Sequence, residues 1–366
     1  MEIVHVSTPS KSYDVMIGSH LLDALVSFFQ KQASLPSSIF ILTDDHVAPH
    51  YLENSKEALA ALGVPIFDHI VPHGDHGKSF DNYYRAITYA LESGVDRKSF
   101  IVALGGGMIG DLAGFVAGTF MRGISFVQLP TTLLAHDSAV GGKTGINHPL
   151  GKNMIGVFHQ PEAVFYDTST LVTLPHEQWR SGFAEVIKHA LIQDSAFYTW
   201  LQAHVTSLTH VTDEDVVHML KKGIAIKANV VSKDEKESGL RAILNFGHTL
   251  GHAIESEAGY GVVSHGDAVA IGMRFALELS RDLGSETLPV DEITAWMKRL
   301  GYPSIPDGMR AEALLEKMKR DKKSTAGKVT MVLLRNIGDT YLRELDDFLL
   351  LNALQQFIQR DKEQFA

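Results

Sequence analysis

Four side chains from three separate segments have the types and spacing of metal ligands. Glu185 sits among apolar residues, where an unpaired carboxylate is costly. His248 and His252 are four residues apart, so they share one face if residues 249–257 are helical. His265 follows in a Ser-His-Gly-Asp sequence. A carboxylate and two histidines with an open position are the usual composition of a catalytic zinc site, although spacing alone does not say which two histidines bind.

A glycine-rich stretch at residues 135–156 carries two lysines and two asparagines. This composition is poor for a core element and favours a loop around a polar ligand. Ordinary surface lysines on a solvated loop are the alternative. Lys143 ends a Gly-Gly-Lys sequence similar to the end of a P-loop, but the first glycine of that motif would fall at Asp137. The pattern therefore fails, which argues against a kinase or NTPase.

A run of glycines, Gly105–Gly107 with Gly110, joins a strand-like segment to a helix-like one. A strand, glycine turn and helix in this order bring backbone N–H groups and a helix N-terminus against a pyrophosphate. Glycine allows the close approach and permits turn positions with positive φ. Pro130-Thr131-Thr132 forms a second such turn. The spacing is not G-x-G-x-x-G, so a turn that only packs a helix on a strand is the alternative.

The elements that must position these residues change character along the chain. The first half alternates short apolar segments with helical ones, which predicts a mostly parallel sheet covered by helices. The expected strands are Glu2–Val6, Tyr13–Ile17, Ser38–Thr43, Val64–Ile70, Ser99–Leu104 and Ser125–Leu129. The expected helices are Leu21–Lys31, a stretch ending at Ala60, Asn82–Ser93 and Leu112–Thr119.

From about Pro175 apolar residues recur at three- and four-residue spacing, which indicates amphipathic or buried helices. These helices are expected at Glu177–Gln193, Val211–Val231, Thr249–Glu257 and Asp267–Leu283, with one late strand at Lys328–Leu334. We therefore expect an α/β N-terminal domain with a Rossmann-like sheet at 1–174 and an all-α C-terminal domain at 175–366. The active site is expected in the cleft between them.

Composition excludes several classes of function. The 366 residues contain no cysteine, so disulfides and thiolate metal sites are excluded. The net charge of -10 argues against a nucleic-acid partner, because phosphate backbones need a clustered basic face. No signal-peptide pattern and no apolar run of membrane-spanning length is present, so we expect a cytoplasmic protein without a membrane partner.

Several motifs, in order, resemble the 3-dehydroquinate synthase family over nearly the whole chain. They are ALGGGMIGDLAGFVAGTFMRG (103–123), QLPTTLLAHDSAVGGKTGINHPLGKNMIGVFHQP (128–161), GFAEVIKHALI (182–192), DEKESGLRAILNFGHTLGHAIE (234–255), SHGDAVAIGM (264–273) and KRDKK (319–323). The resemblance implies a carbon–oxygen lyase of the shikimate pathway, and hence of aromatic amino acid biosynthesis. It implies bound NAD+, a Zn²⁺ ion that Co²⁺ can replace, a small sugar-acid phosphate substrate and a homodimer.

The resemblance also implies roles for individual residues. It assigns zinc to Glu185, His248 and His265, and so selects His265 over His252. It assigns substrate binding to Arg122, Lys143, Asn153, Lys188, Lys227, Arg241, Asn245 and His252. It assigns NAD+ contacts to Asp44, His73, Gly74, Asp75, His76, Gly77, Lys78, Gly107, Met108, Ile109, Gly110, Asp111, Thr131, Thr132, Asp137, Lys143, Lys152, Thr170, Leu171, Val172 and Thr173.

The sequence departs from the family pattern in three places. Asp75 and Asp267 stand where glutamate is usual, and Ala135–Val140 is one residue shorter than the commoner pattern. None of these departures touches the three implied zinc ligands. The implied reaction converts 3-deoxy-D-arabino-heptulosonate 7-phosphate into 3-dehydroquinate and phosphate. The rival interpretations are a sister sugar-phosphate cyclase with the same zinc and NAD+, or a metal-dependent polyol dehydrogenase.

Overall fold

The computed structural model describes residues 1–259, 261–320 and 328–365. It divides into two compact units, and each is considered by itself. Unit 1 comprises residues 1–174 with 216–236, and unit 2 comprises residues 175–215 with 237–366. The KRDKK motif lies partly outside the described residues, because 321–323 are not among them.

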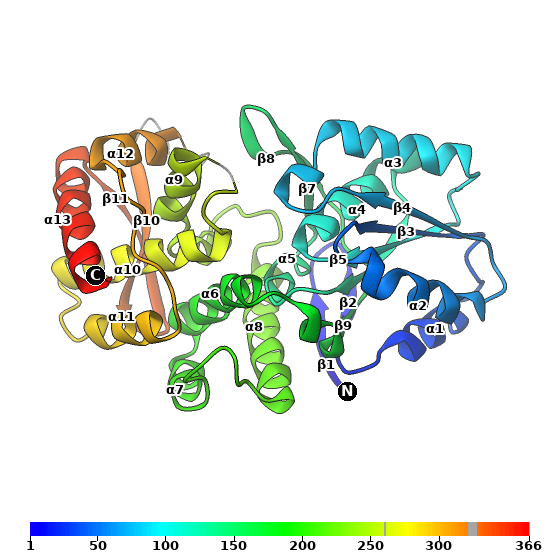
Figure 1. The fold of residues 1–366 in the computed structure, drawn as a ribbon, viewed down its shortest axis with the longest axis horizontal. Coiled ribbons are helices and arrows are strands. Elements are labelled where there is room, and N and C mark those ends of the chain that lie inside the picture. Colours follow the sequence, from blue (N-terminus) through cyan, green and yellow to red (C-terminus); the bar gives the residue numbers. More distant parts are fainter. Residues whose placement is uncertain (260, 321–327, 366) are drawn as a thin grey trace. The chain divides into compact units, whose positions relative to one another are not determined.

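Unit 1 is built on a seven-stranded sheet. Figure 1 shows strands of this sheet beside helices α1, α2, α3 and α4. Its strand order is β1-β2-β9-β6-β5-β3-β4; β1 is antiparallel to β2 and the other pairs are parallel. The strands are β1 (Glu2–Ser7), β2 (Ser12–Gly18), β3 (Ile39–Asp44), β4 (Ile66–Val71), β5 (Phe100–Gly105), β6 (Ser125–Pro130) and β9 (Ala163–Asp167). The six predicted strands are confirmed, whereas β9 was not predicted.

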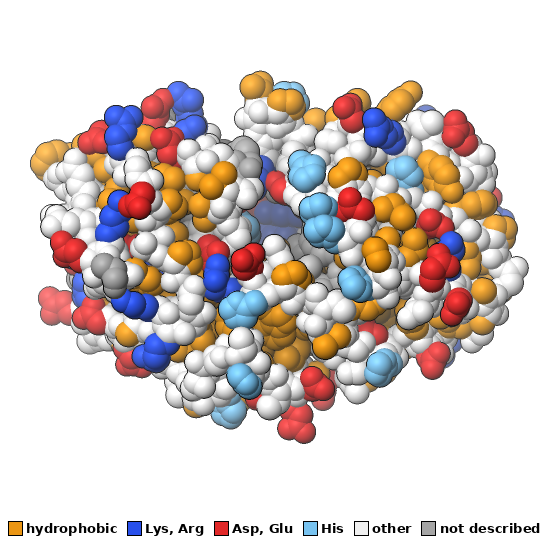
Figure 2. Space-filling model, in the orientation of Figure 1, with side chains coloured by type: hydrophobic (Ala, Val, Ile, Leu, Met, Phe, Trp, Pro, Cys, Tyr) orange, Lys and Arg blue, Asp and Glu red, His pale blue; other side chains and the backbone are white. Residues whose placement is uncertain are grey.

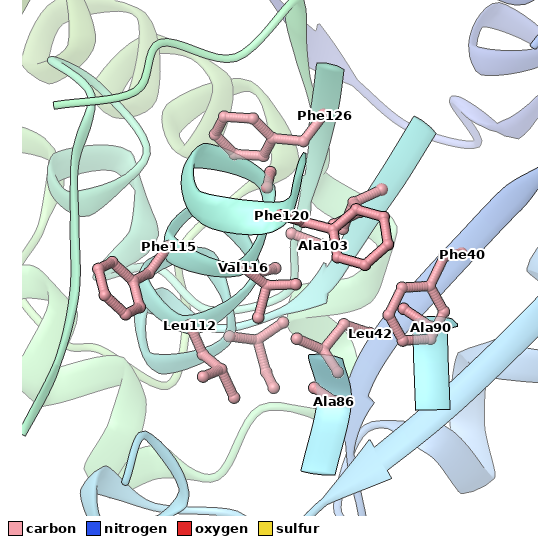
Figure 3. Close-up of a cluster of buried hydrophobic side chains, with 14 of the residues drawn as sticks. Phe40, Leu42, Ala86, Ala90, Ala103, Leu112, Phe115, Val116, Phe120 and Phe126 are labelled. Carbon is pink, nitrogen blue, oxygen red and sulfur yellow. The ribbon is translucent and has the colours of Figure 1, made fainter. Parts of the chain in front are cut away.

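Helices cover both faces of this sheet. The helices are α1 (Leu22–Gln30), α2 (Ala48–Ala60), α3 (Phe80–Glu92) and α4 (Gly107–Thr119). On one face, Phe40 and Leu42 of β3 pack with α3 and α4, as in the core drawn in Figure 3. On the other face, Ile39 and Ile41 pack with α1 and α2. Because side chains alternate along a strand, a fully apolar strand such as β3 requires cover on both faces.

The glycine-rich stretch predicted as a loop is largely ordered structure. A short helix, α5 (Ala135–Ser138), precedes an antiparallel hairpin of β7 (Lys143–His148) and β8 (Gly151–Phe158). The hairpin packs on α4: a Cβ at Gly114 would lie 2.3 Å from Cγ2 of Thr144. The loop prediction was therefore wrong. Within the hairpin, Gly145 and Gly156 allow the two strands to approach closely, because a Cβ at either would lie 2.6 Å or 2.4 Å from a carbonyl oxygen of the opposite strand. Composition alone does not distinguish such a hairpin from a loop.

The segment 216–236 belongs to unit 1, although its place in the chain is within the helical half. It forms most of α8 (Asp213–Lys233) and the turn that follows. Glu235 is its main polar anchor. This buried carboxylate accepts hydrogen bonds from Thr8 Oγ1 (3.2 Å), Ser10 N (3.1 Å) and Gln160 Nε2 (2.8 Å), and from the Ser10 hydroxyl.

The described residues of unit 2 are helical apart from one β-hairpin and the connecting loops. Its helices are α6 (His176–Gln193), α7 (Ser195–His204), α9 (His248–Ala258), α10 (His265–Asp282), α11 (Val290–Arg299), α12 (Ala311–Arg320) and α13 (Asp347–Phe365). The predicted late strand is β10 (Val329–Asn336), which pairs with the unpredicted β11 (Asp339–Leu345). Residues 266–280 of α10 are all buried, so α10 is a central helix of this unit.

The surface carries charges of both signs. On the face drawn in Figure 2, acidic and basic side chains of the described residues are interspersed, unlike the clustered basic face that a phosphate backbone requires. Among the described residues, no helix is both long and apolar enough to cross a membrane.

We predict that Glu235→Ala lowers the free energy of unfolding by about 1–3 kcal/mol, because the buried side-chain donors of Gln160 and Thr8 lose their acceptor. Urea unfolding measures this. Burial raises the pKa of Glu235, but the hydrogen bonds from Ser10, Gln160 and Thr8 outweigh it and lower the pKa overall. The stabilisation is thus present above the unfolded-state pKa of about 4.3 and is lost as pH falls through the folded-state pKa.

The difference in stability between the wild type and this variant should therefore shrink below about pH 4. Glu53→Ala is the control, because the Glu53 side chain is 74% exposed; we expect a change within about 0.5 kcal/mol. Equal losses in both variants, or a difference independent of pH, would contradict the anchoring role of Glu235.

Candidate active site

Three helices of unit 2 bring one potential metal ligand each to a common point. Glu185 lies in the buried stretch of α6, His248 is the first residue of α9, and His265 is the first residue of α10. The Nε2 atoms of His248 and His265 lie 3.3 Å and 3.6 Å from Oε1 of Glu185. One ligand atom from each of the three residues falls within 4.8 Å of the others.

The hydrogen bonds of the two imidazoles determine which nitrogen faces the carboxylate. The Nδ1 atoms of His248 and His265 lie 3.3 Å from the carbonyl oxygen of Phe246 and 3.1 Å from Oε2 of Glu255. Both partners accept hydrogen bonds, so each Nδ1 carries a proton, and each ring in its neutral form presents the Nε2 lone pair to Glu185.

Lone pairs facing a carboxylate require a positive charge among them. Two ligand atoms that are each about 2.1 Å from a tetrahedral Zn²⁺ ion lie roughly 3.4 Å apart. The observed separations of 3.3 Å and 3.6 Å match this value. The donor set of Glu185, His248 and His265 therefore fits a zinc-type ion.

The pKa shifts of Glu185, His248 and His265 also show that positive charge near Glu185 is favourable. Burial raises the pKa of Glu185, but the charges of Lys188 and His248 outweigh it and hold that pKa well below its usual range. Burial lowers the pKa of His265, whereas hydrogen bonds with Glu185 and Glu255 outweigh it and raise that pKa to about 10. At His248 burial dominates and lowers the pKa to about 4. Glu185 is thus ionised at neutral pH.

Close packing of helix backbones sets the spacing of the ligands. A Cβ at Gly266, the residue after His265, would lie 2.0 Å from the carbonyl oxygen of Ser181. A Cβ at Gly272 would lie 1.9 Å from the carbonyl oxygen of Gly247, the residue before His248. Gly247 itself has a φ of +81°, which glycine adopts without steric cost. Only glycine at these points lets α6, α9 and α10 approach closely enough for their side chains to meet.

Four residues to which the family resemblance assigns substrate binding lie in the same unit. Lys188 is buried on α6 with its ammonium group against Oε2 of Glu185. Arg241 is buried in the 3-10 helix η4 (Leu240–Asn245), and Asn245 ends that helix. The His252 ring lies 5.4 Å from that of His248 and 6.0 Å from that of His265.

Sequence reasoning missed two residues that support the metal group. Glu255 contacts His265, and its position seven residues after His248 on the same helical face was the available signal. Arg180 donates hydrogen bonds from Nε and Nη2 to the two carboxylate oxygens of Asp267, and both bonds are 2.8 Å long. This ion pair joins α6 to α10. Nothing in the sequence pairs these two residues, because they are 87 positions apart.

In unit 1, the segments expected to contact a nucleotide follow the carboxyl ends of parallel strands. Asp44 ends β3, residues 73–78 follow β4, the glycine run follows β5, Thr131 and Thr132 follow β6, and η3 (Thr168–Thr173) follows β9. These five strands are consecutive in the sheet, so the segments line one edge of it. Open parallel sheets bind their ligands at this edge.

Local hydrogen bonds fix the shape of that edge. Asp44 is buried, and its Oδ1 accepts hydrogen bonds from the backbone of His46 and Val47 at 2.9 Å and 3.0 Å. Burial raises the pKa of Asp44 despite these bonds. The Tyr51 hydroxyl donates to the carbonyl oxygen of Thr170 at 3.0 Å. The Thr132 hydroxyl is buried and has no partner among the described residues.

The glycine run differs from the predicted turn. Helix α4 begins at Gly107, five residues earlier than expected, and Gly105, Gly106, Gly107 and Gly110 all have ordinary negative φ. They are needed for space: a Cβ at Gly106 would lie 2.7 Å from Thr132, and one at Gly107 the same distance from Ser138. Glycine here brings the β5 and β6 ends together, so the expectation of positive φ was wrong.

Lys78 connects the segment that follows β4 with helix α4 and with the β7–β8 hairpin. Its ammonium group is buried and donates hydrogen bonds to Oδ2 of Asp111 and to Oδ1 of Asn153. Both bonds are 2.8 Å long. It also lies 3.3 Å from Asp75, whose other oxygen is 3.1 Å from Nζ of Lys152. Burial lowers the pKa of Lys78, but the charges of Asp111 and Asp75 raise it overall, so the ammonium group stays charged.

The remaining expected residues of unit 1 fall in different places. Lys227 of α8 reaches Asp137, with Nζ 2.9 Å from Oδ2. Lys143 is the first residue of β7. Arg122 lies elsewhere: α4 runs from the carboxyl end of β5 back to the amino end of β6, so Arg122 is at the opposite edge of the sheet. A six-residue strand, roughly 20 Å, separates the two edges.

Comparison with known proteins shows what this arrangement is similar to. Residues 68–181 match the family described as 3-dehydroquinate synthase N-terminal, and residues 182–324 match the one described as 3-dehydroquinate synthase C-terminal. A 3-dehydroquinate synthase of Bacillus cytotoxicus is 52% identical over 357 residues, which are 98% of this chain and 96% of the relative.

Solved structures share the fold. A 2-deoxy-scyllo-inosose synthase complexed with carbaglucose-6-phosphate, NAD+ and Co²⁺ has a TM-score of 0.88 at 24% identity, covering 97% of this chain and 99% of that one. A 2-epi-5-epi-valiolone synthase of Streptomyces hygroscopicus with NAD+ and Zn²⁺ bound has a TM-score of 0.87 at 24% identity, covering 98% and 99%.

We predict that Lys78→Met destabilises unit 1 by about 1–3 kcal/mol, because the partly buried carboxylate of Asp111, whose side chain is 20% exposed, loses the ammonium donor of Lys78. Urea unfolding followed by circular dichroism measures the loss. Asp111→Asn in the same chain should restore part of it, since the double variant buries no uncompensated charge. Additive losses in the double variant would contradict the ion pair as the source of the stability.

Proposed function

The chain belongs to the 3-dehydroquinate synthase family, and we propose that Glu185, His248 and His265 hold the metal ion of its reaction. The enzyme converts 3-deoxy-D-arabino-heptulosonate 7-phosphate into 3-dehydroquinate and phosphate, a step of the shikimate pathway. A sister cyclase or a polyol dehydrogenase is less well supported, because close relatives over nearly the whole chain are 3-dehydroquinate synthases. The single observation that carries the metal proposal is the pair of Nε2 atoms facing the Glu185 carboxylate.

The chemistry explains why the reaction needs transient oxidation. Phosphate is not readily expelled next to an unactivated C–H bond. A ketone at C5 acidifies the neighbouring C6–H and permits β-elimination of phosphate, after which C5 is reduced again and the ring opens and closes by an intramolecular aldol reaction. When bound, NAD+ supplies the reversible hydride acceptor and the metal ion supplies a Lewis acid at the C5 oxygen.

The residues of this chain bind and orient the substrate. We propose that cationic and polar side chains hold its carboxylate and phosphate, which fixes the leaving group and stabilises developing negative charge. They are Lys143, Asn153, Lys188, Lys227, Arg241, Asn245 and His252; Arg122, which the resemblance also implied, is left out because it lies at the opposite edge of the unit 1 sheet. The substrate phosphate can itself accept the C6 proton, so the mechanism needs no separate protein base.

The carboxyl edge of the unit 1 sheet is the proposed NAD+ site. Support comes from the five segments that follow neighbouring parallel strands, and from the buried Thr132 hydroxyl at that edge. Hydride transfer requires this site and the metal group to act on the same substrate molecule. We also propose, from family resemblance, that the enzyme is a cytoplasmic homodimer and that Co²⁺ can replace Zn²⁺.

Phosphate release by the purified protein tests the function. With 3-deoxy-D-arabino-heptulosonate 7-phosphate and an amount of NAD+ far below that of substrate, we expect release to completion without accumulation of NADH. A chelator should abolish release, and added Zn²⁺ should restore it. Stoichiometric NADH would indicate a polyol dehydrogenase. Activity restricted to another sugar phosphate would indicate a sister cyclase.

A pair of histidine variants tests the ligand assignment. His248→Ala should lose bound metal and turnover, whereas His252→Ala should retain one metal ion per chain and lose turnover by at least about tenfold, as expected for a substrate-binding group. Metal content after gel filtration and initial rates measure both. Full metal content in the His248 variant, or loss of metal in the His252 variant, would contradict the assignment.

A further inference from the structure

A buried carboxylate beside the metal group has no part in the reaction as described above. Glu255 is 2% exposed, and its Oε2 lies 3.1 Å from Nδ1 of His265. It is on α9, the helix that begins with His248. The ligand His265 thus lies between two carboxylates, with Nε2 towards Glu185 and Nδ1 towards Glu255.

The position of Glu255 on α9 is set by helix geometry. Glu255 follows His248 by seven residues, so both side chains lie on one face of the helix, about 10.5 Å apart along its axis. One rigid helix therefore carries a ligand at its first residue and, two turns later, a group that contacts the other histidine ligand. Any movement of α9 shifts both together.

The backbone of His265 is held independently. Ser264 caps α10 by accepting a hydrogen bond from the backbone N–H of Asp267 at 3.1 Å, and the backbone N–H of Gly266 donates to the Ser181 hydroxyl at 3.0 Å. These backbone contacts do not fix the rotation of the His265 imidazole, and they do not determine which of its nitrogens carries the proton. The contact with Glu255 decides both, because a carboxylate only accepts a hydrogen bond from Nδ1–H.

We propose that Glu255 is a positioning residue that fixes the ring orientation and tautomer of His265 and thereby strengthens the binding of a divalent metal ion. The proposal rests on the ligand set given under Proposed function. Carboxylates that orient metal-bound histidines in this way typically contribute a 10–100-fold increase in metal affinity. Glu255 makes no contact with the ion in this role.

The competing explanation is that Glu255 is itself a metal ligand, as part of a second group of potential donors. Ligand atoms of His252, Glu255 and His265 also lie within 4.8 Å of one another, so Glu255 could be a ligand itself. The geometry favours positioning, because Glu185 faces the Nε2 atoms of two histidines whereas Glu255 meets the protonated Nδ1 of one. The two explanations differ in what happens when Glu255 is replaced by a neutral acceptor.

The experiment measures Zn²⁺ affinity of the purified full chain by competition with a chromophoric chelator. Glu255→Gln retains an acceptor for Nδ1–H but loses the charge, and Glu255→Ala loses both. We expect affinity about 10–100-fold below wild type for the alanine variant and an intermediate value for the glutamine variant. Glu278→Gln is the matched control: Glu278 is a buried carboxylate on α10 paired with Arg360 at 2.7 Å, and wild-type affinity is expected.

The absorption spectrum of bound Co²⁺ provides a readout independent of turnover. If Glu255 positions His265, the glutamine variant keeps the wild-type coordination spectrum. Loss of metal as complete as in Glu185→Gln, or a changed coordination number, would show that Glu255 is a ligand and overturn the proposal. Wild-type affinity in the alanine variant would also overturn it.

Two further checks keep the outcomes separate. Wild-type affinity in Glu185→Gln would disprove the proposed ligand set itself, a result independent of how the Glu255 variants rank. The melting temperature of each metal-free variant establishes that it folds. If the alanine variant does not fold, the glutamine variant alone decides. A Zn²⁺ affinity between those of the wild type and Glu185→Gln supports positioning. A wild-type affinity, or an affinity as low as that of Glu185→Gln, overturns it.

Discussion

The burial of one carboxylate dominates the C-terminal unit. Glu185 lies in the interior of a helix whose neighbours are buried, and an ionised carboxylate in such surroundings requires compensation by positive charge. Lys188 supplies part of it from one helical turn away. The Nε2 atoms of His248 and His265 face the same carboxylate at 3.3 Å and 3.6 Å. The close glycine contacts among α6, α9 and α10 and the acceptors for the two Nδ1 atoms all serve to hold this arrangement.

In the N-terminal unit the organising constraint is the direction of the strands. Parallel strands bring all their carboxyl ends to one edge, so loops that are far apart in sequence become neighbours there. Lys78, in the segment after β4, contacts Asp111 in the segment after β5 and Asn153 on the hairpin strand β8. A net charge of -10 is compatible with an anionic ligand, because local carboxylates such as Asp111 and Asp75 hold the cation Lys78 in place.

The family's reaction fits this division of labour. A transient ketone has to be made, used and removed without release of the intermediate, which requires a reversible hydride acceptor and a Lewis acid on one substrate. The α/β unit has the edge that suits a dinucleotide, and the helical unit has the donor set that suits zinc. The family's reaction needs both the hydride acceptor and the Lewis acid, so neither set of residues would suffice alone. Oxidation without elimination of phosphate would be the reaction of a simple dehydrogenase.

Much of the fold was predictable from local pattern. Period-two and buried apolar runs located six of the sheet strands, and helical spacing located α6, α8, α9 and α10. The hairpin of β7 and β8 was missed because its glycines and polar residues look like a loop until α4 provides the surface on which they pack. Strand β11 lacks an apolar run and is defined by its pairing with β10.

For the candidate site, the sequence by itself determined the residue types: a buried glutamate, three candidate histidines, no cysteine and a set of cations in glycine-rich motifs. It left open which histidines converge, and only the resemblance to a family chose between them. The tertiary structure decided which nitrogen of each ring faces Glu185, and that Glu255 and Arg180 support the group. These features depend on contacts between helices, whose side chains lie far apart in sequence and meet only when the backbones pack.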